Sequence, residues 1–297
     1  MVKIYSARTC LGSFNKGTEL APKEILGRSL MSGLAKNAIQ SQLGATEELL
    51  RADKGDAVNA HYRSALVEFN KSLYKKIIKS TSSTDIALTL GGDHAISIAT
   101  MFATKKRHSD CVVVYIDAHP DCNEPQSSPT GNIHGMPLAT VLGDSLYSDF
   151  KLPKYRYDEV FMMGIKDADK FERRYIKKNN ILCVLMDEII EKGIAAALKK
   201  IKQQISGRPV HVSLDIDSID VSEAPGTGII NKGGLSYREV SYLCRNLAQE
   251  KIVAIDLVEV NPTRDIADKT INLSAELIIN LLGGQWSVYD RYLDAKH

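Results

Sequence analysis

The sequence has almost no net charge, no long apolar run and no paired cysteines. Its 38 Lys and Arg residues oppose 36 Asp and Glu residues, for a formal charge of +2 at pH 7. A balance this even implies neither a polyanion nor an acidic membrane surface as a partner. The basic clusters fall at the ends of helical patterns, which is typical of solvated faces. We therefore do not expect nucleic-acid binding.

The longest apolar runs fall well short of the roughly 18 residues that a membrane span requires. The first ten residues, MVKIYSARTC, predict a strand and not the apolar segment of a signal peptide. The five cysteines are an odd number without paired spacing, as expected of free thiols in a reducing compartment. We therefore expect no membrane partner and a cytoplasmic location.

The sequence does contain enough apolar residues, 44% of 297, to build a sizeable core. Stretches rich in Val, Ile and Leu, without polar alternation, predict strands that are covered on both faces. They span residues 2–6, 85–90, 111–117, 158–164, 181–186, 210–217 and 251–260. Helix-period stretches occupy residues 57–79, 95–106, 169–178, 187–203, 236–248 and 274–282. We expect a single domain over residues 1–297, with a three-layer α/β/α fold and a mainly parallel, doubly wound sheet.

Four of the predicted strands end in acids and histidines. The clusters are GGDHAIS at 91–97, DAHPD at 117–121, DID at 215–217 and LVE at 257–259. In open α/β sheets, ligands bind outside the carboxyl ends of the strands. We expect Gly91 and Gly92 to form the tight turn that presents His94. Together the four strand ends predict one site with two histidines and five acids.

Asp117, His119 and Asp121 occupy every second position and would point the same way along a strand. Asp215 and Asp217 repeat this spacing. Carboxylates so close would repel one another, and the segments around them contain no Lys or Arg. Metal ions would supply the missing positive charge. Any one of these aspartates alone could be a turn cap, but together they predict a metal site.

These donors are too numerous for one catalytic ion, and bridging carboxylates would hold two ions about 3.5–4 Å apart. Oxygen-dominated donors with some imidazole suit Mn²⁺, while Co²⁺, Fe²⁺, Ni²⁺ and Zn²⁺ stay open. Two divalent ions and a bridging hydroxide would leave the centre with a charge of about −1, and Glu259 would make the pocket more negative. This charge favours a cationic electrophile over a phosphoester, which would need Arg or Lys around the phosphate.

The same segments resemble the signatures of the ureohydrolase family, and within it those of the arginases. The matching stretches are GGDHAIS, DAHPDCNEPQSSPTGNIHGMPLA, SLDIDSIDVSEAPGTG and LVEVNP, between residues 91 and 262. The resemblance implies an arginase/deacetylase-like fold and a hydroxide, shared by two Mn²⁺ ions, that converts L-arginine to L-ornithine and urea. It implies that one ion is held by His94, Asp117, Asp121 and Asp215, and the other by His119, Asp117, Asp215 and Asp217.

The resemblance also implies roles for residues around the metals. Asp121 would pass a proton to the departing amine, His134 would exchange protons with solvent, and Glu259 would pair with the guanidinium group. A carboxylate matches the planar guanidinium donors, and a histidine that titrates near neutrality suits a shuttle. The other interpretation of His134 is a hydrogen-bonded loop histidine.

The loop CNEPQSSPTGNIHG resembles the arginase loop that binds the far end of the substrate. The resemblance places Asn123, Thr130 and Asn132 against the α-carboxylate, and Asp169 and Glu172 against the α-amino group. Agmatine lacks the α-carboxylate and would leave the first three groups unpaired, at about 1–3 kcal/mol per buried group. L-Arginine is therefore the expected substrate.

Two features depart from the arginase pattern. Ile229 follows GTG where a second Thr is expected near Glu259, and the tail SVYDRYLDAKH shows no obvious trimerisation segment. Homotrimers or homohexamers are nevertheless expected from the family. Three alternatives stay open: another ureohydrolase (an agmatinase or guanidino-acid hydrolase), a non-catalytic metal-binding protein of the same fold, and a two-metal phosphoesterase.

Overall fold

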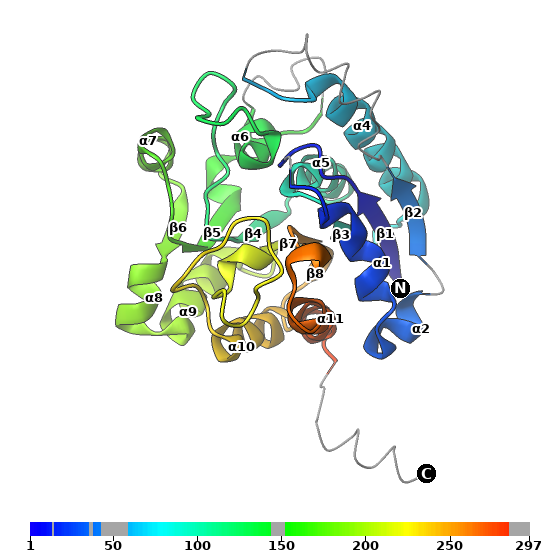
Figure 1. The fold of residues 1–297 in the computed structure, drawn as a ribbon. Helices are drawn as coiled ribbons and strands as arrows, with labels where there is room; N and C mark the ends of the chain where they lie inside the picture. Colours follow the sequence, from blue (N-terminus) through cyan, green and yellow to red (C-terminus); the bar gives the residue numbers. More distant parts are fainter. Residues whose placement is uncertain (14, 36–37, 43–58, 144–151, 285–297) are drawn as a thin grey trace.

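One eight-stranded sheet runs through the protein, with helices on both faces (Figure 1). The computed structural model describes residues 1–13, 15–35, 38–42, 59–143 and 152–284. The strands are β1 (Val2–Arg8), β2 (Ala38–Gln42), β3 (Ile86–Gly91), β4 (Val112–Ile116), β5 (Val160–Ile165), β6 (Leu182–Leu185), β7 (Val210–Asp215) and β8 (Ile252–Val258). Each ladder between neighbouring strands is parallel. The predicted three-layer architecture with a parallel sheet is confirmed.

The helices divide between the two faces of the sheet (Figure 1). One face carries α1 (Ala21–Leu26), α2 (Ser32–Ala35), α8 (Met186–Lys192), α9 (Ile194–Ile205), α10 (Tyr237–Leu247) and α11 (Lys269–Leu281). The other carries α4 (Arg63–Ser80), α5 (Ser97–Arg107), α6 (Pro137–Leu142) and α7 (Lys170–Lys178). Within the described ranges, no helix has the length and apolar character needed to cross a membrane.

The central strand β4 shows why both faces must be covered. Val112 and Val114 are fully buried in the core on one side of the sheet, and Val113 and Tyr115 are fully buried on the other. Successive side chains of a strand point to opposite faces, so an uninterrupted apolar run requires a helical layer on each side. The apolar strand pattern of the sequence therefore predicted correctly that helices cover both faces of the sheet.

Some elements differ from the sequence-based expectation. The single helix predicted over 187–203 is wrong, because Gly193 interrupts it with φ 78° and separates α8 from α9. Glycine adopts this left-handed conformation without a Cβ clash. The sequence patterns also do not predict β2, an edge strand with the sequence AIQSQ, or the short helices α1, α2 and α6. Residues 57 and 58 of the helix predicted over 57–79 lie outside the described residues.

The order of the strands explains why a site forms at one edge of the sheet. The order is β2-β1-β3-β8-β7-β4-β5-β6, so β3, β8, β7 and β4 are consecutive neighbours. These four strands are the ones followed by the polar clusters of the sequence. Because they are parallel, their carboxyl ends meet at the same edge, where α/β proteins bind ligands.

Candidate metal centre

His94 is presented by the turn that follows β3. A Cβ added at Gly92 would lie 2.0 Å from the carbonyl oxygen of Thr9, so only glycine fits this approach of two backbones. Asp93 then caps a short 3₁₀ helix (His94–Ile96) by accepting a hydrogen bond from the Ala95 amide at 3.0 Å. Its other oxygen accepts one from the Gly12 amide at 2.8 Å. The predicted role of the glycines in this turn agrees with this geometry.

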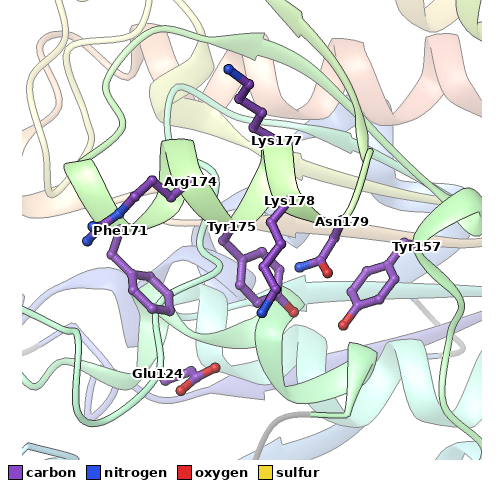
Figure 2. A pocket seen from close by; sticks show the side chains of 8 residues that line it. All are labelled: Glu124, Tyr157, Phe171, Arg174, Tyr175, Lys177, Lys178 and Asn179. Atoms are coloured by element: carbon purple, nitrogen blue, oxygen red, sulfur yellow. The ribbon is translucent and has the colours of Figure 1, made fainter.

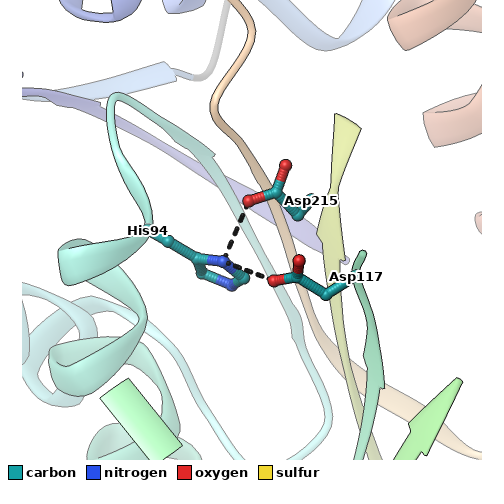
Figure 3. A group of neighbouring side chains, drawn as sticks. All are labelled: His94, Asp117 and Asp215. Atoms are coloured by element: carbon teal, nitrogen blue, oxygen red, sulfur yellow. Dashed lines mark ion pairs between the residues drawn. The ribbon is translucent and has the colours of Figure 1, made fainter. Parts of the chain in front are cut away.

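Three carboxylates converge on one nitrogen of the buried His94 ring. Its Nδ1 lies 3.1 Å from an oxygen of each of Asp117, Asp121 and Asp215 (Figure 3 shows the first and last). An imidazole nitrogen carries at most one proton, so it cannot donate to three acceptors. A cation with several coordination positions can satisfy all of them. This donor set therefore fits a bound metal ion.

The close packing of these carboxylates raises the pKa values of two of them. Burial, with repulsion from Asp121 and Asp217, raises the pKa of Asp117 from 3.8 to about 6. Burial, with repulsion from Asp217 and Asp117, raises the pKa of Asp215 well above its ordinary value. Divalent ions would remove this cost by favouring the ionised carboxylates.

A second group of metal donors shares Asp117 with the first and consists of Asp117, His119 and Asp217. The His119 Nδ1 lies 3.1 Å from Asp217 Oδ2 and 3.5 Å from Asp117 Oδ1. The His119 side chain is 20% exposed, whereas that of His94 is 0% exposed, so this group is the one nearer solvent. Asp215 connects the groups, because its Oδ1 accepts a hydrogen bond from the Asp217 amide at 2.8 Å. All six predicted ligands are thus brought together.

The convergence does not arise from strand alternation, and that part of the sequence argument is wrong. Strand β4 ends at Ile116, so His119 and Asp121 lie in the loop that follows it. Asp121 has the left-handed backbone conformation, with φ 48°, and Asp217 lies in a 3₁₀ turn (Ile216–Ser218). Non-glycine residues rarely adopt positive φ, and such strain concentrates at functional sites.

Glu259 lies beside this cluster, also with a left-handed backbone, at φ 61°. Its Oε1 accepts hydrogen bonds from the His94 amide at 2.9 Å and from His134 Nδ1 at 3.0 Å. Its Oε2 is buried and has no hydrogen-bond partner among the described residues. A buried carboxylate oxygen without a partner is costly unless a ligand pairs with it, so Glu259 is suited to bind a cation.

The contact with Glu259 changes the titration of His134. Burial alone would disfavour the imidazolium, but the Glu259 carboxylate outweighs burial and raises the pKa of His134 from 6.5 to about 9. Without substrate or metal, the pair with Glu259 therefore moves the titration of His134 above the neutral range expected of a shuttle. A guanidinium group that pairs with Glu259 would compete with the imidazolium and lower this pKa.

The residues predicted to bind the amino-acid end of the substrate make hydrogen bonds with other parts of the protein. Asn123 donates from Nδ2 to Asp169 Oδ2 at 2.8 Å. Thr130 is exposed, and its hydroxyl accepts a hydrogen bond from the Asn132 amide at 3.2 Å. Within the part of the chain that the structure describes, Asn132 Nδ2 makes one long hydrogen bond, 3.4 Å, to the Ser13 carbonyl.

Asp169 and Glu172 also have a structural role that the sequence argument does not assign. They form the capping box of α7: Asp169 Oδ1 accepts from the Glu172 amide at 2.9 Å, and Glu172 Oε2 accepts from the Asp169 amide at 3.0 Å. Burial raises the pKa of Glu172 from 4.5 to about 7. The helix cap thus fixes where these two carboxylates stand.

Sequence reasoning missed two further polar residues of the site. Ser213, on β7, places its hydroxyl 2.9 Å from Nε2 of His94, which orients the ring from the side opposite the carboxylates. Thr227 pairs with Val260, next to Glu259, and its buried hydroxyl has no partner in the described part of the chain. Ile229, where a Thr was expected, is 36% exposed. Thr227 therefore lies on the segment that pairs with the residue after Glu259.

A pocket of about 780 Å³ opens beside α7 (Figure 2), and no predicted site residue lines it. It is lined by Glu124, Tyr157, Phe171, Arg174, Tyr175, Lys177, Lys178 and Asn179. Three of these side chains are basic and only one is acidic. This lining does not suit a cationic guanidinium, so we do not place the reaction in this pocket.

Comparison with known proteins gives one consistent result. A family model described as the arginase family matches residues 2–283. The chain is 38% identical to an arginase of Plasmodium berghei, over 69% of this chain and 61% of that protein, and 35% identical to an arginase of Bacillus subtilis, over 92% and 94%. Its fold is similar to a crystal structure of Entamoeba histolytica arginase in complex with L-ornithine, with a TM-score of 0.85 and 26% identity, covering 95% of this chain and 97% of that one.

Proposed function

The chain belongs to the arginase family of hydrolases, and from that premise we propose that it hydrolyses L-arginine to L-ornithine and urea. One observation carries the proposal: three carboxylates meet at His94 Nδ1, beside a buried oxygen of Glu259 that has no partner in the described chain. The first feature suits a divalent cation and the second a guanidinium cation.

The cofactor in this proposal is a pair of Mn²⁺ ions. His94, Asp117, Asp121 and Asp215 would hold one, and His119, Asp117, Asp215 and Asp217 the other. The four carboxylates, with a charge of −4, are balanced by two divalent cations. When bound, such ions lower the pKa of water from ~15.7 toward ~7 and so supply a nucleophile at neutral pH.

Glu259 binds the guanidinium group, which stays protonated at any physiological pH. Its buried Oε2 offers a charge-assisted hydrogen bond, and bidentate pairing becomes available when His134 leaves Oε1. His134 then exchanges protons with solvent, which its partly exposed position supports.

Asp121 transfers the proton to the departing amine. It is 8% exposed, at the edge of the cluster, and only its Oδ2 is engaged in hydrogen bonds within the described chain. Its Oδ1 is therefore available to a reacting group. A positioned carboxylate in such a role contributes about 10²–10⁴-fold to rate.

The amino-acid end of the substrate is read by Asn123, Thr130 and Asn132 on the carboxylate side, and by Asp169 and Glu172 on the amino side. The Asn123–Asp169 contact joins the two groups. Agmatine would leave the amides of Asn123 and Asn132 without an α-carboxylate partner, so L-arginine is preferred over agmatine.

We further propose that residues 1–297 form a single domain, that the protein is cytoplasmic, and that it assembles as a homotrimer or homohexamer. The five free cysteines support a reducing compartment. Light scattering during size-exclusion chromatography measures the assembly, and a monomer would contradict this part.

The decisive experiment removes the metals with a chelator and reloads the full chain separately with Mn²⁺, Co²⁺ or Ni²⁺. Urea release is then compared for L-arginine, agmatine and guanidinobutyrate. We expect the highest kcat/KM with L-arginine and Mn²⁺. Urea from agmatine or guanidinobutyrate but not from L-arginine would overturn the substrate. Two bound ions with background turnover on all three substrates would indicate a non-catalytic protein.

A further inference from the structure

Tyr115 makes direct contact with two of the candidate ligands, although it is not one itself. It is the fourth residue of β4 and is fully buried. Its ring stacks on the imidazole of His94, with centroids 4.7 Å apart and planes 1° from parallel. Its hydroxyl lies 2.8 Å from Asp121 Oδ2 and 3.1 Å from His94 Nδ1. A single side chain thus touches two neighbours of one metal position.

The phenol has a single proton, which it can donate to one of these two acceptors. The carboxylate oxygen of Asp121 is closer than the imidazole nitrogen, and a charged acceptor makes the stronger hydrogen bond. Nδ1 of His94 also faces three carboxylates and therefore holds either a proton or a cation. In both cases it accepts nothing from the phenol, so Tyr115 donates to Asp121.

This hydrogen bond holds the Asp121 carboxylate, which has few other partners among the described residues. Asp121 follows the end of β4 in a left-handed backbone conformation. Apart from His94, Tyr115 is its only side-chain hydrogen-bond partner within the described residues, and both contacts use Oδ2. The bond therefore fixes the rotation of the carboxylate and leaves Oδ1 without a hydrogen-bond partner among the described residues.

We propose that Tyr115 is a positioning residue for one of the two metal ions. Its ring sets the plane of His94, and its hydroxyl sets the carboxylate of Asp121. Tyr115 does not contact the two donors that belong to the second group alone: His119 Nδ1 faces Asp217 Oδ2 at 3.1 Å, and Asp217 Oδ1 accepts a hydrogen bond from the Ala118 amide. The inference rests on the proposed two-ion centre and predicts that the two ions respond differently to loss of one hydroxyl.

Tyr115→Phe tests this inference, because the stacked ring remains and only the hydroxyl is lost. The matched control is Tyr155→Phe. Tyr155 is also buried, and its hydroxyl bonds the Met101 carbonyl at 2.9 Å and Cys111 at 3.2 Å, away from the candidate ligands. Mn²⁺ titration of the chelator-treated full chain, followed by electron paramagnetic resonance, counts the ions and their affinities.

We expect Tyr155→Phe to bind two ions, each with the same affinity as in wild type. Tyr115→Phe should bind one ion as wild type does and the other about 10–100-fold more weakly. At saturating Mn²⁺ its kcat should fall more than its KM for L-arginine changes. Two unchanged Mn²⁺ affinities in Tyr115→Phe would overturn the inference. Failure of wild type to bind two ions would instead overturn the proposed metal centre.

A double-mutant cycle separates positioning from general packing. In an Asp121→Ala background, the acceptor that receives the hydrogen bond is gone, so Tyr115→Phe should change Mn²⁺ affinity much less than in wild type. If the hydroxyl only supports the fold, its removal would weaken Mn²⁺ binding equally in both backgrounds. Thermal unfolding of the metal-free variants shows whether Tyr115→Phe and Tyr155→Phe are equally stable.

Discussion

Nδ1 of His134 lies 3.0 Å from Oε1 of Glu259, although the two residues are 125 positions apart in the sequence. The pair places a titrating base directly on the carboxylate that we propose binds the guanidinium group. Because the imidazolium and the substrate are both cations, they compete for Glu259. Substrate binding and proton release from His134 are thereby coupled.

This pair predicts a pH dependence that Glu259→Gln should abolish. In wild type the pKa of His134 is about 9, above the ordinary 6.5, because of the Glu259 carboxylate. Its contribution to stability is therefore complete below pH 6.5 and is lost as the pH rises through about 9. In Glu259→Gln the pKa should fall below this value, because the carboxylate that raises it most is removed while Asp121 and Asp93 still favour the imidazolium.

NMR titration of His134 in the metal-free protein measures this change, and thermal unfolding between pH 6 and 10 measures the linked stability. Glu188→Gln, which removes a carboxylate from an ion pair with Lys200, is the control. A His134 pKa that stays near 9 in Glu259→Gln would show that another acid sets it.

Asp121→Asn should lose most turnover while keeping at least one metal ion. Asp121 approaches only His94 among the two candidate histidine ligands, so the group of Asp117, His119 and Asp217 is unaffected. Loss of a proton-transfer group costs about 10²–10⁴-fold in kcat. Elemental mass spectrometry counts the metal, and steady-state kinetics give kcat. Turnover near that of wild type would remove the proton-transfer role.

Asn132→Ala should raise KM for L-arginine with a smaller effect on kcat. Among the described residues its amide makes one long contact, with the Ser13 carbonyl, so truncation should leave the fold intact. Losing a hydrogen bond to a charged group costs about 1.5–3 kcal/mol, which corresponds to roughly 10–150-fold in KM when KM reflects binding. Agmatine is the internal control, because it has no α-carboxylate to lose. An equal loss with both substrates would contradict the assignment.

Gly92→Ala should disrupt the turn that presents His94. The added methyl group would meet the backbone of Thr9, which cannot move aside as a flexible side chain can. We expect a stability loss of about 1–3 kcal/mol and weaker Mn²⁺ binding. Gly33→Ala is the control, since no atom lies within 4 Å of a Cβ at that position. Denaturant unfolding and Mn²⁺ titration check both, and equal behaviour of the two variants would show that the contact is not limiting.

Much of the fold followed from local sequence patterns. Apolar runs without alternation, such as Val112–Val114 in β4, indicated strands with two covered faces, and the structure has them. The patterns failed where local signals are weak. The edge strand β2 is half polar, and the break at Gly193 lies inside an otherwise continuous helical period.

The candidate ligands could be named from the sequence, but their geometry could not. Donor types and their place after predicted strands identified His94, Asp117 and Asp215. The expected alternation along a strand was nevertheless wrong, because β4 stops at Ile116 and a left-handed Asp121 turns the loop back. Where a chain leaves its strand depends on neighbouring strands and loops, which no short motif contains.

By itself the sequence determined the set of oxygen and nitrogen donors, their need for a cation, and the layers that carry them. Those properties depend on side-chain chemistry and on periods of a few residues. Only the tertiary structure decided that Glu259 reaches the amide of His94 across 165 positions, and that Asp117 belongs to both donor groups. It also decided that Tyr115 touches Asp121. These contacts depend on the order β3-β8-β7-β4 and on the packing between strands, since a distance between remote residues is set by the whole sheet.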